Sequence, residues 1–401
     1  MTLSVSNATA ILKTIYPSGN VPMDMVYADF PLFAMLPKIE SFYGENLKLP
    51  IKYANNSGRS ATFSTAVSSE SNAKAVAFLL TRIQDYAYAR IANEVLEASR
   101  NNAGAFVDAL KFEMDSAILS LSASTASGVY GTGSGKIGQI AATTTIGTAI
   151  MILTNVNDVV NYDVDQVLQV SSTDGGGTVR TGTLKVLSVN RANGQITMTG
   201  NLTAGIAAIA TGDFVFSSGD YDKKVSGLQA WIPNSAPSST AFFGVNRTLD
   251  SRLGGVRADY SSLPIEEALI DGAKLINSYG GAPKHCFMDY TNLGNLTKAL
   301  GSKVQYVDVA IAGVGFRGIQ VNTGRGIMNV FGDQNCPNDR MFMLQLDTWG
   351  LYSLGKVPSI FKGDGQAILR VGSEDALEFR ALAYYQLGCK APFFNGNFKI
   401  A

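Results

Sequence analysis

Histidine and cysteine side chains are the first candidates for chemistry in this chain of 401 residues. Its one histidine, His285, stands beside Cys286, while Cys336 and Cys389 lie far along the sequence. His285 falls within a predicted strand over 284–289, where alternation points it and Cys286 to opposite faces of a sheet. That placement disfavours a Cys–His nucleophile pair. The cysteines lack zinc-ligand spacing and are odd in number, so we interpret them as reduced, buried thiols.

Two glycine-rich stretches resemble phosphate-binding loops. Residues 313–318 match GxGxxG after a predicted strand, but a dinucleotide site needs a helix to begin there, and the next residues favour a strand and a turn. Residues 131–136 end in Gly-Lys, yet Tyr130 stands where Walker A needs glycine and Ile137 where it needs Ser or Thr. Both stretches are therefore predicted to be turns or connectors.

The carboxylates of the C-terminal region fall among predicted turns, and no spacing between them selects an acid–base pair. No Gly-x-Ser-x-Gly motif presents a serine nucleophile either. We therefore predict no catalytic residue, no metal site and no cofactor, and a protein that is not an enzyme. The carboxylates considered are Asp333, Asp339, Asp347, Asp364, Glu374, Asp375 and Glu378.

The composition excludes several classes of protein. Apolar residues make up 46% and charged residues 16%, against about 25% charged in an average domain, so a mostly disordered chain is excluded. Lys plus Arg equals Asp plus Glu at 32 each, without the basic excess of a protein held to nucleic acid by many phosphate contacts. No apolar run approaches a membrane span, and residues 1–19 do not read as a signal peptide. Low charge, zero net charge and 41 glycines indicate extensive burial against other chains.

The first forty residues contain four prolines, which exclude a long helix, and apolar side chains that need burial, among them Phe30 and Phe33. Two arrangements satisfy both facts: an extended arm on another subunit, or a meander over the chain's own core. From 40 to 85 the period-2 pattern predicts a long hairpin. Its second strand covers 75–88, and its tip, 57–71, is small-residue and predicted to be flexible. Exposed strand edges of this kind are used by interlocking subunits.

The remaining chain is predicted to be a mixture of helices and strands. An apolar stripe predicts a long helix over 102–124. The Thr-rich segment 141–219 contains short predicted strands and the hairpin signal Asn193-Gly194, which favours a small inserted β barrel or sandwich. Further on, a helix is expected from Pro264 to Gly280 and another over 290–300, with short strands between and after them.

This order of elements resembles that of HK97-like major capsid proteins of tailed bacteriophages, over nearly the whole chain except 141–219. The similar stretches are Tyr27–Pro37, Lys48–Tyr53, Gly58–Phe63, Asn93–Ser99 and Gly388–Asn395. The resemblance implies an α+β, HK97-like capsid fold with an inserted small β-barrel or sandwich domain. Its parts would be an N-terminal arm over 1–39, an E-loop hairpin over 40–85, a spine helix and peripheral domain over 86–140, the inserted domain over 141–219, more peripheral domain over 220–241, an axial domain over 242–356 and a return to the peripheral domain over 357–401.

The resemblance also implies a function. We expect a structural protein that self-assembles into hexamers and pentamers of an icosahedral shell around double-stranded DNA, located in the virion capsid after synthesis in the bacterial cytoplasm. Because the arm begins close to Met1, a separate scaffolding protein is expected, together with a portal. Contact with DNA should be weak and non-specific, and no membrane is involved. The alternatives are a virion-surface or extracellular β-rich binding module and, third, a dinucleotide-dependent enzyme.

Candidate contacts between subunits lie in the hairpin and the arm. The stems of long basic side chains can cover a neighbour's surface while their charges meet its carboxylates. Some relatives also cross-link a lysine to an asparagine of a neighbouring subunit. Here the asparagines would be Asn395 or Asn397, and nothing in the sequence shows that they meet a hairpin lysine. The candidate contact residues are Lys48, Lys52, Arg59, Phe63, Phe30 and Phe33.

Overall fold

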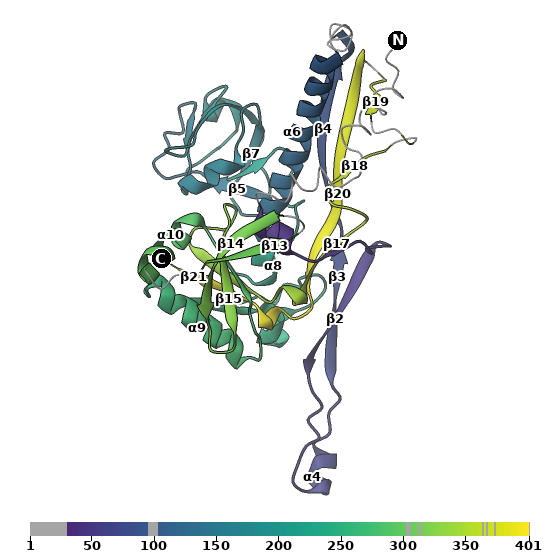
Figure 1. Ribbon diagram of the computed structural model, residues 1–401, viewed down its shortest axis with the longest axis vertical. Coiled ribbons are helices and arrows are strands. Elements are labelled where there is room, and N and C mark those ends of the chain that lie inside the picture. Colours follow the sequence, from purple (N-terminus) through teal and green to yellow (C-terminus); the bar gives the residue numbers. More distant parts are fainter. Residues whose placement is uncertain are drawn as a thin grey trace.

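The computed structural model describes residues 30–94, 103–301, 306–311, 314–362, 365, 368–372 and 374–400. Most of the predicted arm, residues 1–29, lies outside the described residues, as do Asn102 at the predicted helix start and most of the stretch 93–99. Figure 1 shows an elongated body built on one long strand, a hairpin that projects from its lower end, and two more compact sheet domains to one side.

The long strand β20 (Ala376–Cys389) is the axis of the elongated sheet. Its partners along the two edges are β4 (Ile83–Ala92), β17 (Trp349–Ser353), β18 (Ser359–Ile360) and β19 (Ile368–Arg370), and β1 (Lys38–Ile39) adds to β17. The helix α6 (Ala103–Tyr130) packs along β4 and β20 (Figure 1). It runs beyond the predicted end at Ser124 to Tyr130, and the hydroxyls of Ser122 and Thr125 donate to carbonyls one turn earlier in it.

The hairpin consists of β2 (Asn46–Ala54) and β3 (Lys74–Thr81), which form a sheet of their own. The predicted strand over 75–88 is therefore two strands, and the predicted hairpin boundary at 85 is wrong. The chain changes partner at Arg82, whose Nη1 donates to the Phe42 carbonyl at 2.6 Å while its guanidinium lies over the Phe42 ring. After this anchor, β4 pairs with β20 instead.

A sheet of seven strands forms the domain in the lower left of Figure 1. Its strand order is β11 (Val256–Asp259), β21 (Gly396–Lys399), β16 (Arg340–Leu344), β12 (His285–Met288), β15 (Ile327–Gly332), β14 (Val314–Asn322) and β13 (Tyr306–Ile311). The predicted helices are confirmed as α9 (Ile265–Ser278) and α10 (Tyr290–Leu300). The predicted ranges 242–356 and 357–401 each contribute strands to both large sheets, because the chain crosses between the sheets before β17 and again after β20.

The predicted inserted domain is a separate six-stranded sheet with its own apolar core. Its order is β5 (Lys136–Gln139), β10 (Phe214–Ser217), β7 (Val167–Ser171), β8 (Leu184–Asn190), β9 (Gln195–Met198) and β6 (Ile150–Ile152). A bridge between Ile140 and Leu153 brings the ends of the two edge strands together. The unit begins at Lys136, not at 141, because β5 pairs with β10 from the far end of the insertion. The hairpin predicted at Asn193-Gly194 is confirmed as the turn between β8 and β9.

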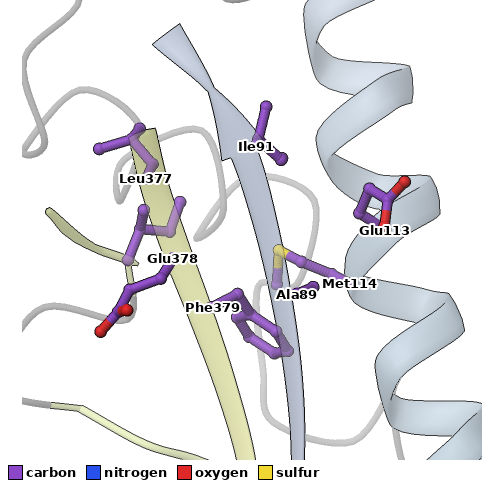
Figure 2. Close-up of a pocket in the computed structure, with 8 residues that line it drawn as sticks. Ala89, Ile91, Glu113, Met114, Leu377, Glu378 and Phe379 are labelled. Carbon is purple, nitrogen blue, oxygen red and sulfur yellow. The ribbon is translucent and has the colours of Figure 1, made fainter. Parts of the chain in front are cut away.

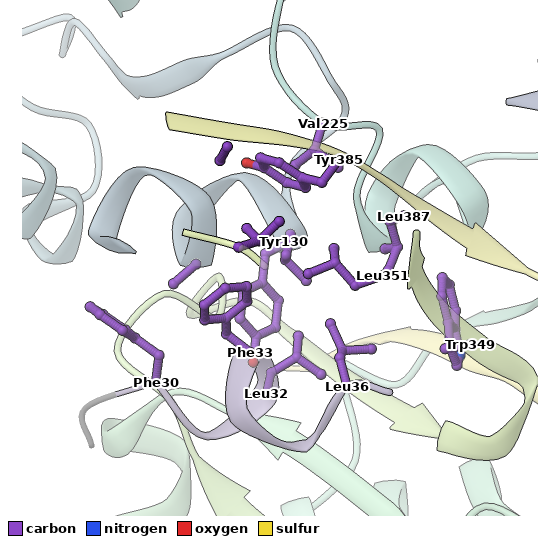
Figure 3. Close-up of a cluster of buried hydrophobic side chains, with 14 of the residues drawn as sticks. Phe30, Leu32, Phe33, Leu36, Tyr130, Val225, Trp349, Leu351, Tyr385 and Leu387 are labelled. Atoms are coloured by element: carbon purple, nitrogen blue, oxygen red, sulfur yellow. The ribbon is translucent and has the colours of Figure 1, made fainter. Parts of the chain in front are cut away.

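The end of the predicted arm packs on the chain's own core. Pro31 opens the short helix α3 (Pro31–Met35), a position that suits its fixed φ, and the helix directs its apolar side chains inward. In Figure 3, Phe30, Phe33 and Leu36 lie in the cluster that also contains Tyr130 and Leu351. Phe30 and Phe33 are buried within their own chain, and their expected intersubunit role stays a prediction.

Candidate assembly surface

The residues considered first for catalysis are not arranged for it. The His285 ring stacks on Phe331, at 6.2 Å between ring centroids, while Cys286 is buried in the core on the other face of the sheet. Burial raises the pKa of Cys286 and Cys336 and brings that of Cys389 to about 12. A thiol that stays protonated at neutral pH is a poor nucleophile, so these cysteines serve packing.

The described residues of the first glycine-rich stretch, 314–318, lie in the strand β14 and not in the predicted turn, while 131–135 connect α6 to β5. After 313, which lies outside the described residues, the chain continues as β14 and no helix begins there. Gly135 has a φ of +82°, and a Cβ on it would approach the Asp220 carbonyl oxygen to 2.5 Å, so glycine is required where the chain enters the inserted domain. Within the described ranges, no three His, Cys, Asp or Glu side chains gather as a metal site would need. No described helix has the length and apolarity to cross a membrane.

A small cavity between β4, β20 and α6 shows how closely the elongated body is packed (Figure 2). Its volume is about 10 Å³, room for about one water molecule. Ala89, Ile91, Met114 and Phe379 contribute apolar walls, and no substrate would fit.

The base of the hairpin is rigidly attached to the body. The Phe78 ring packs against Trp231, with 5.1 Å between centroids, and the Leu79 N–H donates to the Phe243 carbonyl at 2.9 Å. Leu49 and Leu80 lie over Gly388 of β20, where a Cβ would come within 2.9 Å of both side chains. The body therefore fixes the direction in which the hairpin projects.

The described part of the chain leaves the outer part of the hairpin exposed. From 55 to 75 every described residue except Gly58 and Ala66 is exposed, as Figure 1 illustrates for the projecting tip. The tip carries a short helix, α4 (Phe63–Ser68), where the sequence predicted only a flexible turn. The Phe63 side chain is 85% exposed, and Val67 of the same helix is also exposed. Because Phe63 and Val67 are four residues apart in the helix, the tip presents both apolar side chains on one face.

The tip is shaped by hydrogen bonds within itself. Ser57 Oγ donates to the Ser69 carbonyl at 2.9 Å and lies 2.7 Å from Ser71 Oγ. Asn56 Oδ1 accepts from the Gly58 N–H at 2.7 Å. These short links tie both ends of the tip together, so Phe63 is presented on a preformed loop.

The basic residues predicted to contact a neighbour are all exposed. Lys48 and Lys52 stand on the face of β2 opposite the buried Leu49 and Ile51, and Arg59 stands at the tip. With the described residues, none of the three forms a salt bridge. The structure therefore places the three charges and Phe63 on one projecting element, separate from Phe30 and Phe33.

The asparagines considered for a cross-link are buried. Asn395 Oδ1 accepts from the Gln345 N–H at 2.7 Å and from Trp349 Nε1 at 2.8 Å. Asn397 Nδ2 donates to the Ile232 carbonyl at 2.8 Å. Both amides complete interior contacts, so neither is presented to a lysine of another subunit.

Two buried polar joints hold the parts that position the hairpin, and sequence patterns did not reveal them. Lys224 Nζ donates to Asp85 Oδ2 at 2.8 Å and to Ser124 Oγ at 2.8 Å, which links β4, α6 and the segment after the inserted domain. The side chains of Lys224 and Asp85 are 11% and 10% exposed. Asp333 forms the second joint, with Tyr130 and the Leu32 N–H. Because the residues of each joint are far apart in the sequence, no local spacing predicts these contacts.

Comparison with known proteins finds no matching family model and no matching curated relative. Among solved structures, the capsid of cyanophage A-1(L) is 12% identical and covers 92% of both chains, with a TM-score of 0.51. The capsid of a native GTA particle is 8% identical, covering 91% of this chain and 88% of that one, with a TM-score of 0.47. The capsid of Myoviridae phage XM1 is 9% identical, covering 92% and 91%, with a TM-score of 0.44. The cyanophage match shows a shared fold, which confirms the resemblance to capsid proteins and the α+β class at the level of the fold.

Proposed function

We propose that this chain is a structural protein that self-assembles into a closed shell. The observation that carries the proposal is the projecting hairpin, whose tip presents Phe63 at 85% exposure on a loop that no described part of its own chain covers. Burying a phenylalanine side chain contributes about 1.5–3 kcal/mol, which a neighbouring subunit can supply and water cannot. The fold shared with a capsid subunit supports the same conclusion.

A hairpin that leaves one side of a subunit and docks on the next copy makes a head-to-tail contact. Repeated with a fixed rotation, such a contact closes into a ring, and rings of six and five copies are the units of an icosahedral shell. In this arrangement Phe63 fills a site on the neighbour, and Lys48, Lys52 and Arg59 meet its carboxylates. Partly buried charge pairs of this kind select the partner and the register more than they add affinity.

The shell we propose encloses double-stranded DNA in a virion, and its subunits are made in the bacterial cytoplasm. A separate scaffolding protein directs assembly and a portal occupies one vertex. The contact with DNA is weak and independent of sequence, since the chain has 32 basic and 32 acidic residues. The role is structural, without catalysis.

The docking of the tip can be tested with a photo-cross-linking amino acid at position 63. The expected product in assembled particles is a covalent dimer, in which residue 63 of one copy is joined to the surface of its neighbour. Unassembled subunits should give none. The control carries the same amino acid at Leu187, an exposed position of the inserted domain. Cross-linking of residue 63 to its own chain, or equal dimer yields in assembled and free protein, would contradict the proposed docking.

A further inference from the structure

The inserted domain touches the seven-stranded domain at a point away from its two connecting segments. Asn338 Nδ2, in the loop before β16, donates to Asn155 Oδ1 of the inserted domain at 3.2 Å. Asn155 is the N-cap of the 3₁₀ helix η1 (Val156–Asn161), because the same Oδ1 accepts from the Asn157 N–H at 3.1 Å. The contact therefore joins a fixed helix end on one side to a loop on the other.

The loop side of this contact is also held in place. The Asn338 carbonyl accepts from Asn292 Nδ2 at 2.6 Å, and Asn292 Nδ2 also donates to Asp289 Oδ1 at 2.6 Å. Asp289 is the N-cap of α10, and its side chain is buried. A line of side-chain and main-chain hydrogen bonds thus leads from the core of one domain to the surface of the other.

Asp158 stands at the inserted-domain end of this line. Its Oδ1 accepts from Asn155 Nδ2 at 2.9 Å, so the carboxyl group orients the amide that meets Asn338. The charged groups around it are Lys136 of β5 and Asp339 of the loop. Lys136 is engaged by Asp174 at 2.7 Å, and Asp339 by Arg340 at 3.3 Å.

Burial is the main influence on Asp158, and it raises the pKa of this carboxyl group from 3.8 to about 6. The charge of Asp339 acts in the same direction, while Lys136 and the hydrogen bond from Asn155 oppose it. Burial raises the pKa of the Tyr162 hydroxyl group well above its ordinary value, and the charge of Asp158 acts in the same direction.

We propose that Asp158 is a proton-operated latch, which holds the inserted domain against the 338–339 loop when protonated and releases it when ionised. Release frees the side of the domain that carries η1, while its two connections near 131–135 and 218–224 stay attached to the body through Lys224 and Asp85. The latch is a property of the single chain and does not depend on the proposed shell function.

The direction of the pH effect follows from linkage. In the docked state the pKa of Asp158 is about 6, and in a released, solvated state it returns toward 3.8. Docking therefore takes up a proton. Docking of the inserted domain is tightest below pH 3.8, weakens as the pH rises to about 6 and changes little above pH 6. A shift of about two pKa units limits the change in the docking equilibrium constant to roughly a hundredfold. The change is smaller to the extent that the inserted domain buries Asp158 by itself, because that burial remains after release.

The test measures the distance between the two domains in the full-length protein. Spin labels at Leu187→Cys in the inserted domain and Ile270→Cys on α9, both exposed positions, report the distance distribution from pH 4.5 to pH 8. The expected result is a narrow distribution at low pH that broadens with a midpoint between pH 4 and pH 6. Asp158→Asn, neutral at every pH and still able to accept from Asn155, should stay narrow throughout.

Three further variants make the result decisive. Asn338→Ala, which removes the donor, should give a broad distribution at every pH. Asp339→Asn removes the neighbouring charge and should move the midpoint to lower pH, which tests the latch even if the protein with Asp158→Asn does not fold. Asp165→Asn, at an exposed carboxylate of the same domain, should behave as the unsubstituted protein. A distribution that does not change with pH, or an unchanged midpoint with Asp339→Asn, would overturn the proposal.

Discussion

The hydroxyl group of Tyr130, the last residue of α6, donates a 2.9 Å hydrogen bond to Asp333 Oδ2 in the loop after β15. The same carboxylate oxygen accepts from the Leu32 N–H at 3.3 Å, and Oδ1 accepts from the Asn335 N–H. One buried carboxylate therefore joins the end of the arm, the long helix and the seven-stranded domain. Burial raises the pKa of Asp333, while these three donors act against the rise.

The change Tyr130→Phe should destabilise the protein in a pH-dependent way. Because the pKa of Asp333 is raised in the folded state, its contribution to the unfolding free energy is fully present below pH 3.8, the pKa of the unfolded chain. That contribution is lost as the pH rises through the folded-state pKa. Removing a donor to the carboxylate deepens that loss, so the variant should be near the parent at pH 4 and about 1–3 kcal/mol less stable at pH 8. Urea unfolding at several pH values measures this. Tyr352→Phe, a buried control whose hydroxyl has no hydrogen-bond partner among the described residues, should lack the trend. An equal loss at pH 4 and pH 8 would contradict the role of Asp333.

The change Lys224→Met should cost about 3–5 kcal/mol, because it leaves the carboxylate of Asp85 buried without its cation. The double variant Lys224→Met with Asp85→Asn should recover a large part of the lost unfolding free energy, as measured by chemical denaturation. The matched control is Lys185→Met, which removes an ammonium group that pairs with Asp165 at 2.7 Å on the exposed surface and should cost less than about 1 kcal/mol. Equal costs for the two lysine variants would show that burial of the joint is unimportant.

The inserted domain should fold alone only if β5 is present. A fragment over 134–219 contains every strand of its sheet, whereas 141–219 lacks β5 and the buried Ile140. We expect the longer fragment to melt cooperatively as a β domain and the shorter one to be unfolded, as judged by circular dichroism. Two folded fragments would mean that β5 is dispensable, and two unfolded fragments would mean that the insertion depends on the rest of the chain.

Reversing the charge at the hairpin tip should impair assembly and leave the fold intact. Arg59 is exposed and makes no salt bridge with a described residue, so Arg59→Glu should change the unfolding free energy of the free subunit by no more than about 0.5 kcal/mol. Light scattering should show a reduced yield of large particles, and Arg59→Lys should restore it. Normal assembly of the Arg59→Glu protein would remove this residue from the proposed interface.

The free subunit should bind duplex DNA weakly at physiological salt. With equal numbers of basic and acidic residues, the chain cannot release the many counterions on which tight binding depends. Fluorescence anisotropy with labelled duplexes of unrelated sequence measures the affinity. A tight complex whose affinity falls steeply with salt would favour a nucleic-acid-binding role instead.

Much of the fold could be predicted because its signals are local. The helix α9 follows Pro264 and is ended near Gly280, whose φ is +93°, and α10 ends before Gly301, whose φ is +53°. The turn at Asn193-Gly194 lies in the short loop between the paired residues Asn190 and Gln195, where Gly194 has a φ of +66°. In each case the determinant of the structure lies inside the element it shapes.

The features that could not be predicted depend on partners far away in sequence. The stretch 75–88 is predicted as one strand, but the change of partner from β2 to β20 at Arg82 divides it in two and moves the inward positions from even-numbered to odd-numbered residues. In the same way β5 is defined by β10. The burial of Phe33 could not be predicted for a related reason, since the core that buries it is assembled from distant segments.

The central claim, that this chain builds shells through its hairpin tip, is tested most directly by electron microscopy of the purified full-length protein. The comparison is a variant in which 57–71 is replaced by a short Gly-Ser turn, with circular dichroism to confirm that both proteins fold. We expect the parent protein to form shells, rings or sheets and the shortened protein to remain as discrete subunits. Discrete monomers of the parent at every concentration, or shells from both proteins, would contradict the claim.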